Sequence, residues 1–201
     1  CLWIIMMAMA RYSFGNQDEA VELAFDAVEA LGEPELKPQI RSATTVELMI
    51  RNYATLEDVP PLNTSDVNPI ARARMLICLL LGIGSVSMGG PFRKIATTKY
   101  GLQPSNIKLV GQWYHQKAFQ MSYEQGDINS WTIMHNYIHK VGWYEADQVR
   151  QCYRRVQALI NSNSVRPEYR VESASFLFMW YIPYAPEFNK PGIKQMIDIL
   201  P

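Results

Sequence analysis

Residues 68–84, NPIARARMLICLLLGIG, decide the fold of this 201-residue chain. Every residue from 75 to 81 is apolar, so a helix formed there has no polar face. A helix that is apolar on all sides is buried in a core. The leading asparagine can cap the helix, the following proline fits its first turn, and the two glycines favour an end. The sequence therefore predicts a buried central helix over about residues 68–82, whose apolar run is too short to span a membrane.

The composition allows one sizeable core or two small lobes, because 48% of the residues are hydrophobic and 19% are charged. The chain starts within an apolar run, CLWIIMMAM, that lacks the basic segment and the cleavage site of a signal peptide. We expect that residue 1 is not the natural start. Cys1, Cys78 and Cys152 are odd in number and far apart, which argues for a reducing compartment. We therefore expect an intracellular location, in the cytoplasm or in a virion.

The clearest amphipathic helix is predicted at residues 16–32, NQDEAVELAFDAVEALG, where apolar residues recur at helical spacing. The helix over residues 2–14 that precedes it is predicted to be buried. The opposite face of the 16–32 helix is acidic, through Asp18, Glu22, Asp26 and Glu29. We expect this acidic face to contact a partner.

The remaining segments also favour helices. A capping box at Thr44 and Glu47 predicts a helix start. The glycine-rich stretch GIGSVSMGG, residues 82–90, lacks the spacing of a nucleotide-binding loop and is predicted to be a flexible connection. Further helices are predicted from Pro91 to the residue before Gly101, and then over residues 104–125, 127–142, 144–160 and 191–200. The continuous apolar run at residues 173–182 fits a buried helix or a strand by its length, and the helical context favours a helix. No alternating strand pattern is present, so the predicted fold class is all-α.

The loop before the central helix is the predicted domain boundary. It contains two consecutive prolines and the turn-forming run NTS. We expect two helical lobes around the central helix, an acidic lobe over residues 1–58 and a basic lobe over residues 68–201, joined by a linker at 59–67.

Charge is distributed unevenly along the chain, although the net charge is zero. Residues 1–70 hold 11 acidic and 4 basic residues, whereas residues 71–201 hold 8 acidic and 15 basic residues. Such asymmetry is typical of proteins that bind polyanions or associate with copies of themselves. Two helical lobes that differ by chance would give the same pattern.

Signals for catalysis or metal binding are weak. His135 and His139 are one helical turn apart and could share a metal, but HNYIH lacks the glutamate of a zinc-protease motif and implies no third ligand. No nucleophile elbow is present. Cys152 falls on a predicted core stripe, where a thiol is inert. We therefore expect no catalytic residue, no metal and no cofactor.

Basic residues and aromatic residues alternate in the second part of the chain. Lys and Arg contact phosphates, and aromatic rings stack on the bases of single-stranded nucleic acids. The predicted RNA-binding residues are Arg72, Arg74, Arg93, Lys94, Lys99, Arg150, Arg154, Arg155, Arg166 and Arg170, with Tyr100, Trp143 and Tyr144 as stacking aromatics. Solvated helix faces would also account for each of the basic residues taken singly.

The sequence thus favours a non-enzymatic, self-assembling structural protein that binds single-stranded RNA, of the nucleocapsid or coat type. Its acidic lobe would lie against a neighbour's basic surface, leaving a basic cleft for the phosphate backbone. The alternative is a helical protein–protein interaction domain that binds no nucleic acid.

Overall fold

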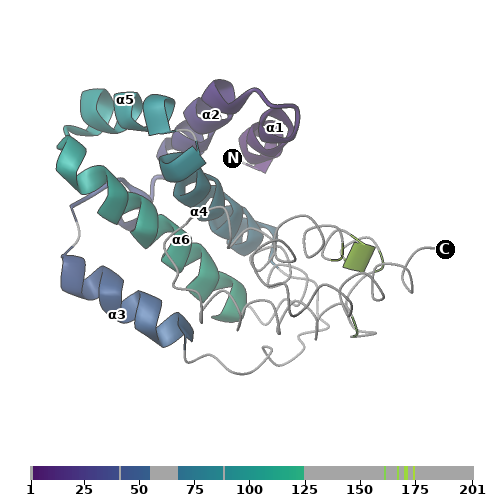
Figure 1. Ribbon diagram of the computed structural model, residues 1–201. Coiled ribbons are helices and arrows are strands. Elements are labelled where there is room, and N and C mark those ends of the chain that lie inside the picture. The colour runs from purple at the N-terminus through teal and green to yellow at the C-terminus, as the bar shows by residue number, and fades with distance from the viewer. Residues whose placement is uncertain are drawn as a thin grey trace. The chain divides into compact units, whose positions relative to one another are not determined.

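The structure, a computed structural model, describes residues 2–40, 42–54, 68–87 and 89–124, together with Asn161, Pro167, Arg170, Val171 and Ala174. This part of the chain is helical and contains no strand, so the all-α prediction is confirmed (Figure 1). Its α-helices are α1 (Leu2–Ser13), α2 (Gln17–Leu31), α3 (Ala43–Ala54), α4 (Pro69–Ser87), α5 (Gly89–Tyr100) and α6 (Ile107–Glu124). Short 3₁₀ turns, Pro34–Leu36 and Pro104–Asn106, precede α3 and α6.

The chain divides into two compact units, of which one comprises residues 1–56 and 65–125 and holds all six labelled helices. The other comprises residues 57–64 and 126–201 and lies mostly outside the described residues. Within the first unit α4 contacts α1, α2, α5 and α6. Helices that the sequence assigns to an acidic and to a basic lobe therefore pack in one core.

The central helix α4 is buried, as predicted. Met75, Ile77, Cys78, Leu79 and Leu80 are each at most 2% exposed. Figure 1 shows α4 passing between the α1–α2 pair and α6. The cap is also as predicted, because the backbone N–H of Ile70 donates to Asn68 Oδ1 at 2.9 Å. Burial of the apolar part of this helix supplies the middle of the core.

The predicted end of the central helix is wrong. The helix runs through Gly82 and Gly84 to Ser87, so most of the predicted loop at residues 82–90 is helical. The physical reason is close packing against α6. A Cβ atom on Gly82 would lie 2.9 Å from the Cα and backbone N of His115. Gly82 therefore permits two helices to approach each other, and it does not end one.

The ends of α2 and α5 agree with the sequence. Gly32 and Gly101 follow α2 and α5 with φ of 67° and 65°, the left-handed conformation expected after a helix. Two helix starts differ from the prediction: α5 begins at Gly89 and not at Pro91, and the cap of α3 is Ser42 and not Thr44. The backbone N–H of Thr45 donates to Ser42 Oγ at 3.1 Å, which places Thr44 inside the first turn.

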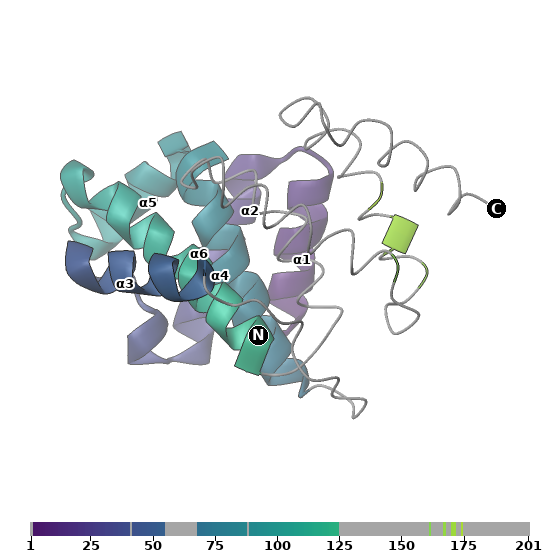
Figure 2. The ribbon, with the colours of Figure 1, turned by 60° about the horizontal axis from the view of Figure 1, so that its bottom comes forward.

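The prediction that the first helix is buried holds for one side of α1 only. Ile5 and Ala8 are buried, and α1 packs against α2 and α4. Figures 1 and 2 show α1 and α2 as neighbouring helices joined by a tight turn. Trp3 and Met6, however, are 70% and 69% exposed.

No single helix in the described part of the chain is both long and apolar enough to cross a bilayer. Pro69–Ser85 and Gly90–Tyr100 reach that length and composition only when taken together, across a bend of 111°.

Candidate nucleic-acid interface

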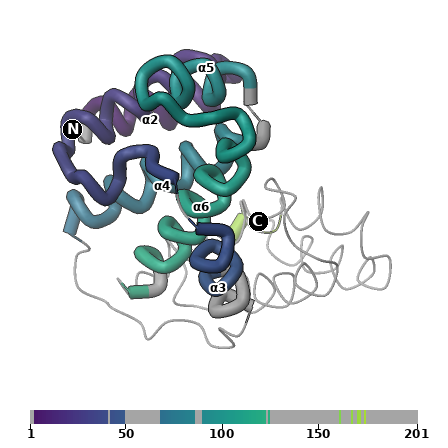
Figure 3. The backbone as a smooth tube through the Cα atoms, turned by 90° about the vertical axis from the view of Figure 1, so that its left-hand side faces the viewer, coloured from purple at the N-terminus to yellow at the C-terminus, as the bar shows by residue number. Residues whose placement is uncertain are grey.

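Six of the predicted RNA-binding residues lie in the first unit. Arg72 and Arg74 are partly buried near the start of α4, and Arg93, Lys94, Lys99 and Tyr100 belong to α5. Figures 1 and 3 place α5 beside α2, at the end of the unit opposite α3. Arg170 is described but belongs to the second unit. The others, Trp143, Tyr144, Arg150, Arg154, Arg155 and Arg166, lie outside the described residues.

Arg74 is engaged by a carboxylate of its own chain. Its Nε donates to Glu33 Oε1 at 2.6 Å, and its Nη2 contacts the same oxygen. The contact is partly buried, and the two residues are 41 positions apart in the sequence. Charge-assisted hydrogen bonds of this kind are strong, so Arg74 is held away from a phosphate ligand.

Tyr100 also forms contacts within its own chain. Its hydroxyl donates to Glu29 Oε1 at 2.7 Å, and its ring lies 5.5 Å from the ring of Phe25, centroid to centroid. Lys37 Nζ lies 3.3 Å from the other Glu29 oxygen. The hydrogen bond from Tyr100 is the main reason that the pKa of Glu29 is lowered, with Lys37 adding to it. Burial, followed by the contact with Glu29, raises the pKa of Tyr100.

Lys99 contacts one residue of α2 and one residue of α5. Its Nζ lies 3.7 Å from Asp26 Oδ1 and 5.7 Å from the centroid of the Tyr100 ring. Both partners of the ion pair are well exposed, so the contact is worth little energetically. It nevertheless places a negative charge beside this lysine.

Arg93 and Lys94 differ from Lys99, the cation in the last turn of α5. Both are exposed, and no carboxylate among the described residues forms an ion pair with either side chain. The two residues are adjacent in the sequence and lie in the middle of the helix. Of the candidate residues in α5, they are the ones whose charge is open to a ligand.

The predicted acidic face of α2 also contains two kinds of residue, those that contact residues of their own chain and those that are exposed. Asp26 and Glu29 contact Lys99, Tyr100 and Lys37 of their own chain. Asp18 and Glu22 are exposed, and no cation among the described residues pairs with them. Some of the acidic residues on this face are thus paired with basic residues within the first unit.

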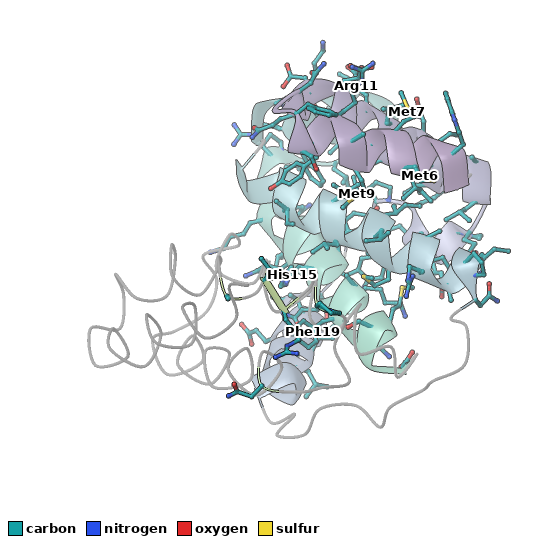
Figure 4. All side chains as sticks on the ribbon, turned by 90° about the vertical axis from the view of Figure 1, so that its right-hand side faces the viewer. Met6, Met7, Met9, Arg11, His115 and Phe119 are labelled. Atoms are coloured by element: carbon teal, nitrogen blue, oxygen red, sulfur yellow. The ribbon has the colours of Figure 1, made fainter. Side chains whose placement is uncertain are left out.

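A buried histidine in α6 was not singled out by the sequence. His115 is fully buried, and desolvation lowers its pKa to about 3, so the ring is neutral. Figure 4 shows His115 and Phe119 on α6. The only sequence signal would have been its place within the apolar pattern of residues 107–119.

The buried Cys78 and His115 belong to no metal-binding cluster in the part of the chain described. Burial raises the pKa of Cys78 to about 12, which keeps its thiol protonated and unreactive. Among the described residues no group of three or more His, Cys, Asp and Glu side chains could hold a metal. His135 and His139 lie outside these residues, so their predicted role stays untested.

Comparison of the chain with protein-family models, with curated proteins and with solved structures found no match.

Proposed function

We propose that this protein is a non-enzymatic structural protein that assembles with copies of itself and binds the phosphate backbone of single-stranded RNA. The observation that supports the RNA-binding half is the adjacent, exposed pair Arg93 and Lys94 on α5. The excess of basic residues after position 70 supports it further. Such residues neutralise phosphates and release the counterions condensed on the nucleic acid, which drives sequence-independent binding.

The internal contacts narrow the proposed set of RNA-binding residues. Arg74 and Lys99 face carboxylates, and the Tyr100 ring packs against Phe25, so these three contribute less than the sequence suggests. Arg72 is partly buried. The proposed phosphate contacts in the first unit are therefore Arg93 and Lys94. The contributions of the candidates in residues 125–201 remain predictions.

The self-assembly half is supported by Asp18 and Glu22. These two carboxylates form the exposed part of the acidic face of α2, and no cation among the described residues pairs with them. A negative surface on one copy attracts a positive surface on another and fixes their relative orientation.

The test of RNA binding compares two charge deletions. The variant R93A/K94A should bind a labelled 20-nucleotide oligouridine more weakly than wild type, with a salt dependence reduced by about 0.7 units per lost phosphate contact. The control is K108A, which removes an exposed lysine from α6 and should leave binding unchanged. Equal binding by wild type and R93A/K94A in fluorescence anisotropy would contradict the proposed site.

A second candidate function is a helical protein-interaction domain without nucleic acid. It is favoured by the neutralisation of Arg74 by Glu33 and of Lys99 by Asp26, which leaves fewer free cations than the sequence implies. Retention on a polynucleotide column at low salt, compared with an uncharged matrix, separates the two functions. Retention supports RNA binding, and its absence supports the interaction domain.

A further inference from the structure

The acidic face of α2 is paired along one half of its length. Its members recur every three or four residues and so lie on one side of the helix: Asp18, Glu22, Asp26 and Glu29. Asp26 Oδ1 lies 3.7 Å from Lys99 Nζ, and the Tyr100 hydroxyl donates to Glu29 Oε1 at 2.7 Å. Lys99 and Tyr100 are the last two residues of α5, so this helix already complements the second half of the acidic face.

The first half of the acidic face and the middle of α5 carry opposite charges that are not used in this way. Asp18 and Glu22 are exposed, and no cation in the described part of the chain forms an ion pair with either. Arg93 and Lys94 are exposed as well, and no described carboxylate pairs with them. Two helices that contact each other therefore present two open carboxylates and two open cations.

A second copy of the chain is the partner that supplies the opposite charge to both pairs. Surfaces of opposite charge steer two molecules together and fix their relative orientation. Lys108 on α6 is also exposed, but it is a single charge. Arg93 and Lys94 are adjacent, and they belong to the helix whose last turn already complements the acidic face.

We propose that Asp18 and Glu22 of one copy pair with Arg93 and Lys94 of a second copy. This proposal names the surfaces that meet in the self-assembly half of the proposed function, and it rests on that half. Exposed ion pairs are individually worth little, so association through this contact is weak and sensitive to salt. RNA phosphates compete with the two carboxylates for the same cations, so bound RNA weakens the contact.

Sedimentation velocity of the full chain without RNA tests this contact. Wild type should associate more strongly at about 0.01 M salt than at about 0.15 M, because the Debye length falls from about 30 Å to about 8 Å. At the lower salt concentration, D18K/E22K and R93E/K94E should each raise the dissociation constant of self-association by about tenfold, since like charges then face each other. The combined variant D18K/E22K/R93E/K94E should associate as wild type does, because both surfaces are reversed and the net charge is unchanged.

The matched control is E47K/E124K, which changes the net charge as D18K/E22K does but at exposed residues of α3 and α6. It should associate as wild type does. Far-UV circular dichroism checks the folding of every variant. The neutral variants D18N/E22Q and R93Q/K94Q, which remove the charges without reversing them, should also weaken association.

The outcomes separate this contact from the rest of the proposed function. Equal association of wild type and both reversals, equal loss in D18K/E22K and the control, or no recovery in the combined variant would overturn the contact and leave self-assembly through another surface. A wild type that stays monomeric at low salt would contradict the contact and the self-assembly half together. Saturating oligouridine should lower the association of wild type, and association unchanged by bound oligouridine would show that the two ligands do not share Arg93 and Lys94.

Discussion

Gly82 in α4 and His115 in α6 are in direct backbone contact. A Cβ atom at position 82 would lie 2.9 Å from the Cα, Cβ and backbone N of His115, a separation that real Cβ atoms do not show. The two most extensively packed helices of the unit therefore cross at a residue without a side chain. This contact explains both why the helix passes through a glycine and why a histidine is enclosed in the core.

The Gly82→Ala substitution is expected to destabilise the protein. The added methyl group meets backbone atoms, so the helices must move apart, which costs about 1–3 kcal/mol of unfolding free energy. Urea denaturation measures this loss. Gly90→Ala is the control, because a Cβ there meets nothing within 4 Å, and it should leave stability unchanged or raise it by up to about 1 kcal/mol. Equal effects of the two substitutions would contradict the close crossing.

Leu80→Ala tests burial of the central helix. Leu80 is 2% exposed, so its truncation leaves a cavity and should lower the unfolding free energy by roughly 2–5 kcal/mol. Leu48→Ala, at a residue that is 58% exposed, should change it by less than about 0.5 kcal/mol. A loss at Leu80 as small as that at Leu48 would place α4 at the surface.

His115 predicts a loss of stability in mild acid. Its pKa is about 3 in the folded protein, below the value of about 6.5 for an unfolded chain, so the unfolded state gains a proton first as the pH falls. The stability that the neutral ring provides is present above pH 6.5 and is lost progressively down to pH 3. Between pH 7 and pH 5 the loss is about 2 kcal/mol.

Urea midpoints at pH 7 and pH 5 measure this dependence, and His115→Gln should remove most of it. An NMR titration of the wild-type imidazole gives an independent result, with no protonation expected above pH 4. Protonation near pH 6.5 in the folded protein would show that the ring is solvated.

Tyr100→Phe tests the contact between α5 and α2. The substitution removes the hydroxyl that donates to Glu29 and should cost about 1 kcal/mol of stability. Since that hydrogen bond lowers the pKa of Glu29, the pKa should rise in the variant. An NMR titration of the Glu29 carboxyl group measures the change, and an unaltered pKa would mean that the nearby lysines, Lys37 and Lys99, lower it without the hydroxyl.

Local signals in the sequence were sufficient to predict the six α-helices of the described residues, whereas contacts between distant residues were not predictable. The burial of Leu79 and Leu80 and the helix ends at Gly32 and Gly101 follow from apolar runs and from glycine's conformational freedom. The pairing of Tyr100 with Glu29 joins residues 71 positions apart, so it depends on how α2 and α5 pack. Arg74, which the sequence suggests as an RNA-binding residue, forms the same kind of long-range contact with Glu33.

The exposed side of α1 was unpredictable for a related reason. Its residues are apolar around most of the helix, so composition alone indicates complete burial. Packing against α2 and α4 covers only the side that carries Ile5 and Ala8. A sequence pattern identifies a helix with apolar residues to bury, but only the arrangement of the neighbouring helices shows which side is buried.

The salt dependence of RNA binding by the wild-type protein tests the proposed function most directly. Fluorescence anisotropy with labelled oligouridine and with a mixed-sequence RNA of equal length, from low to physiological salt, supplies the measurement. Phosphate contacts predict that the logarithm of the affinity falls linearly with the logarithm of salt concentration, with a slope of about −0.7 per contact and equal slopes for both RNAs. Folded protein that binds neither RNA at low salt would contradict the account.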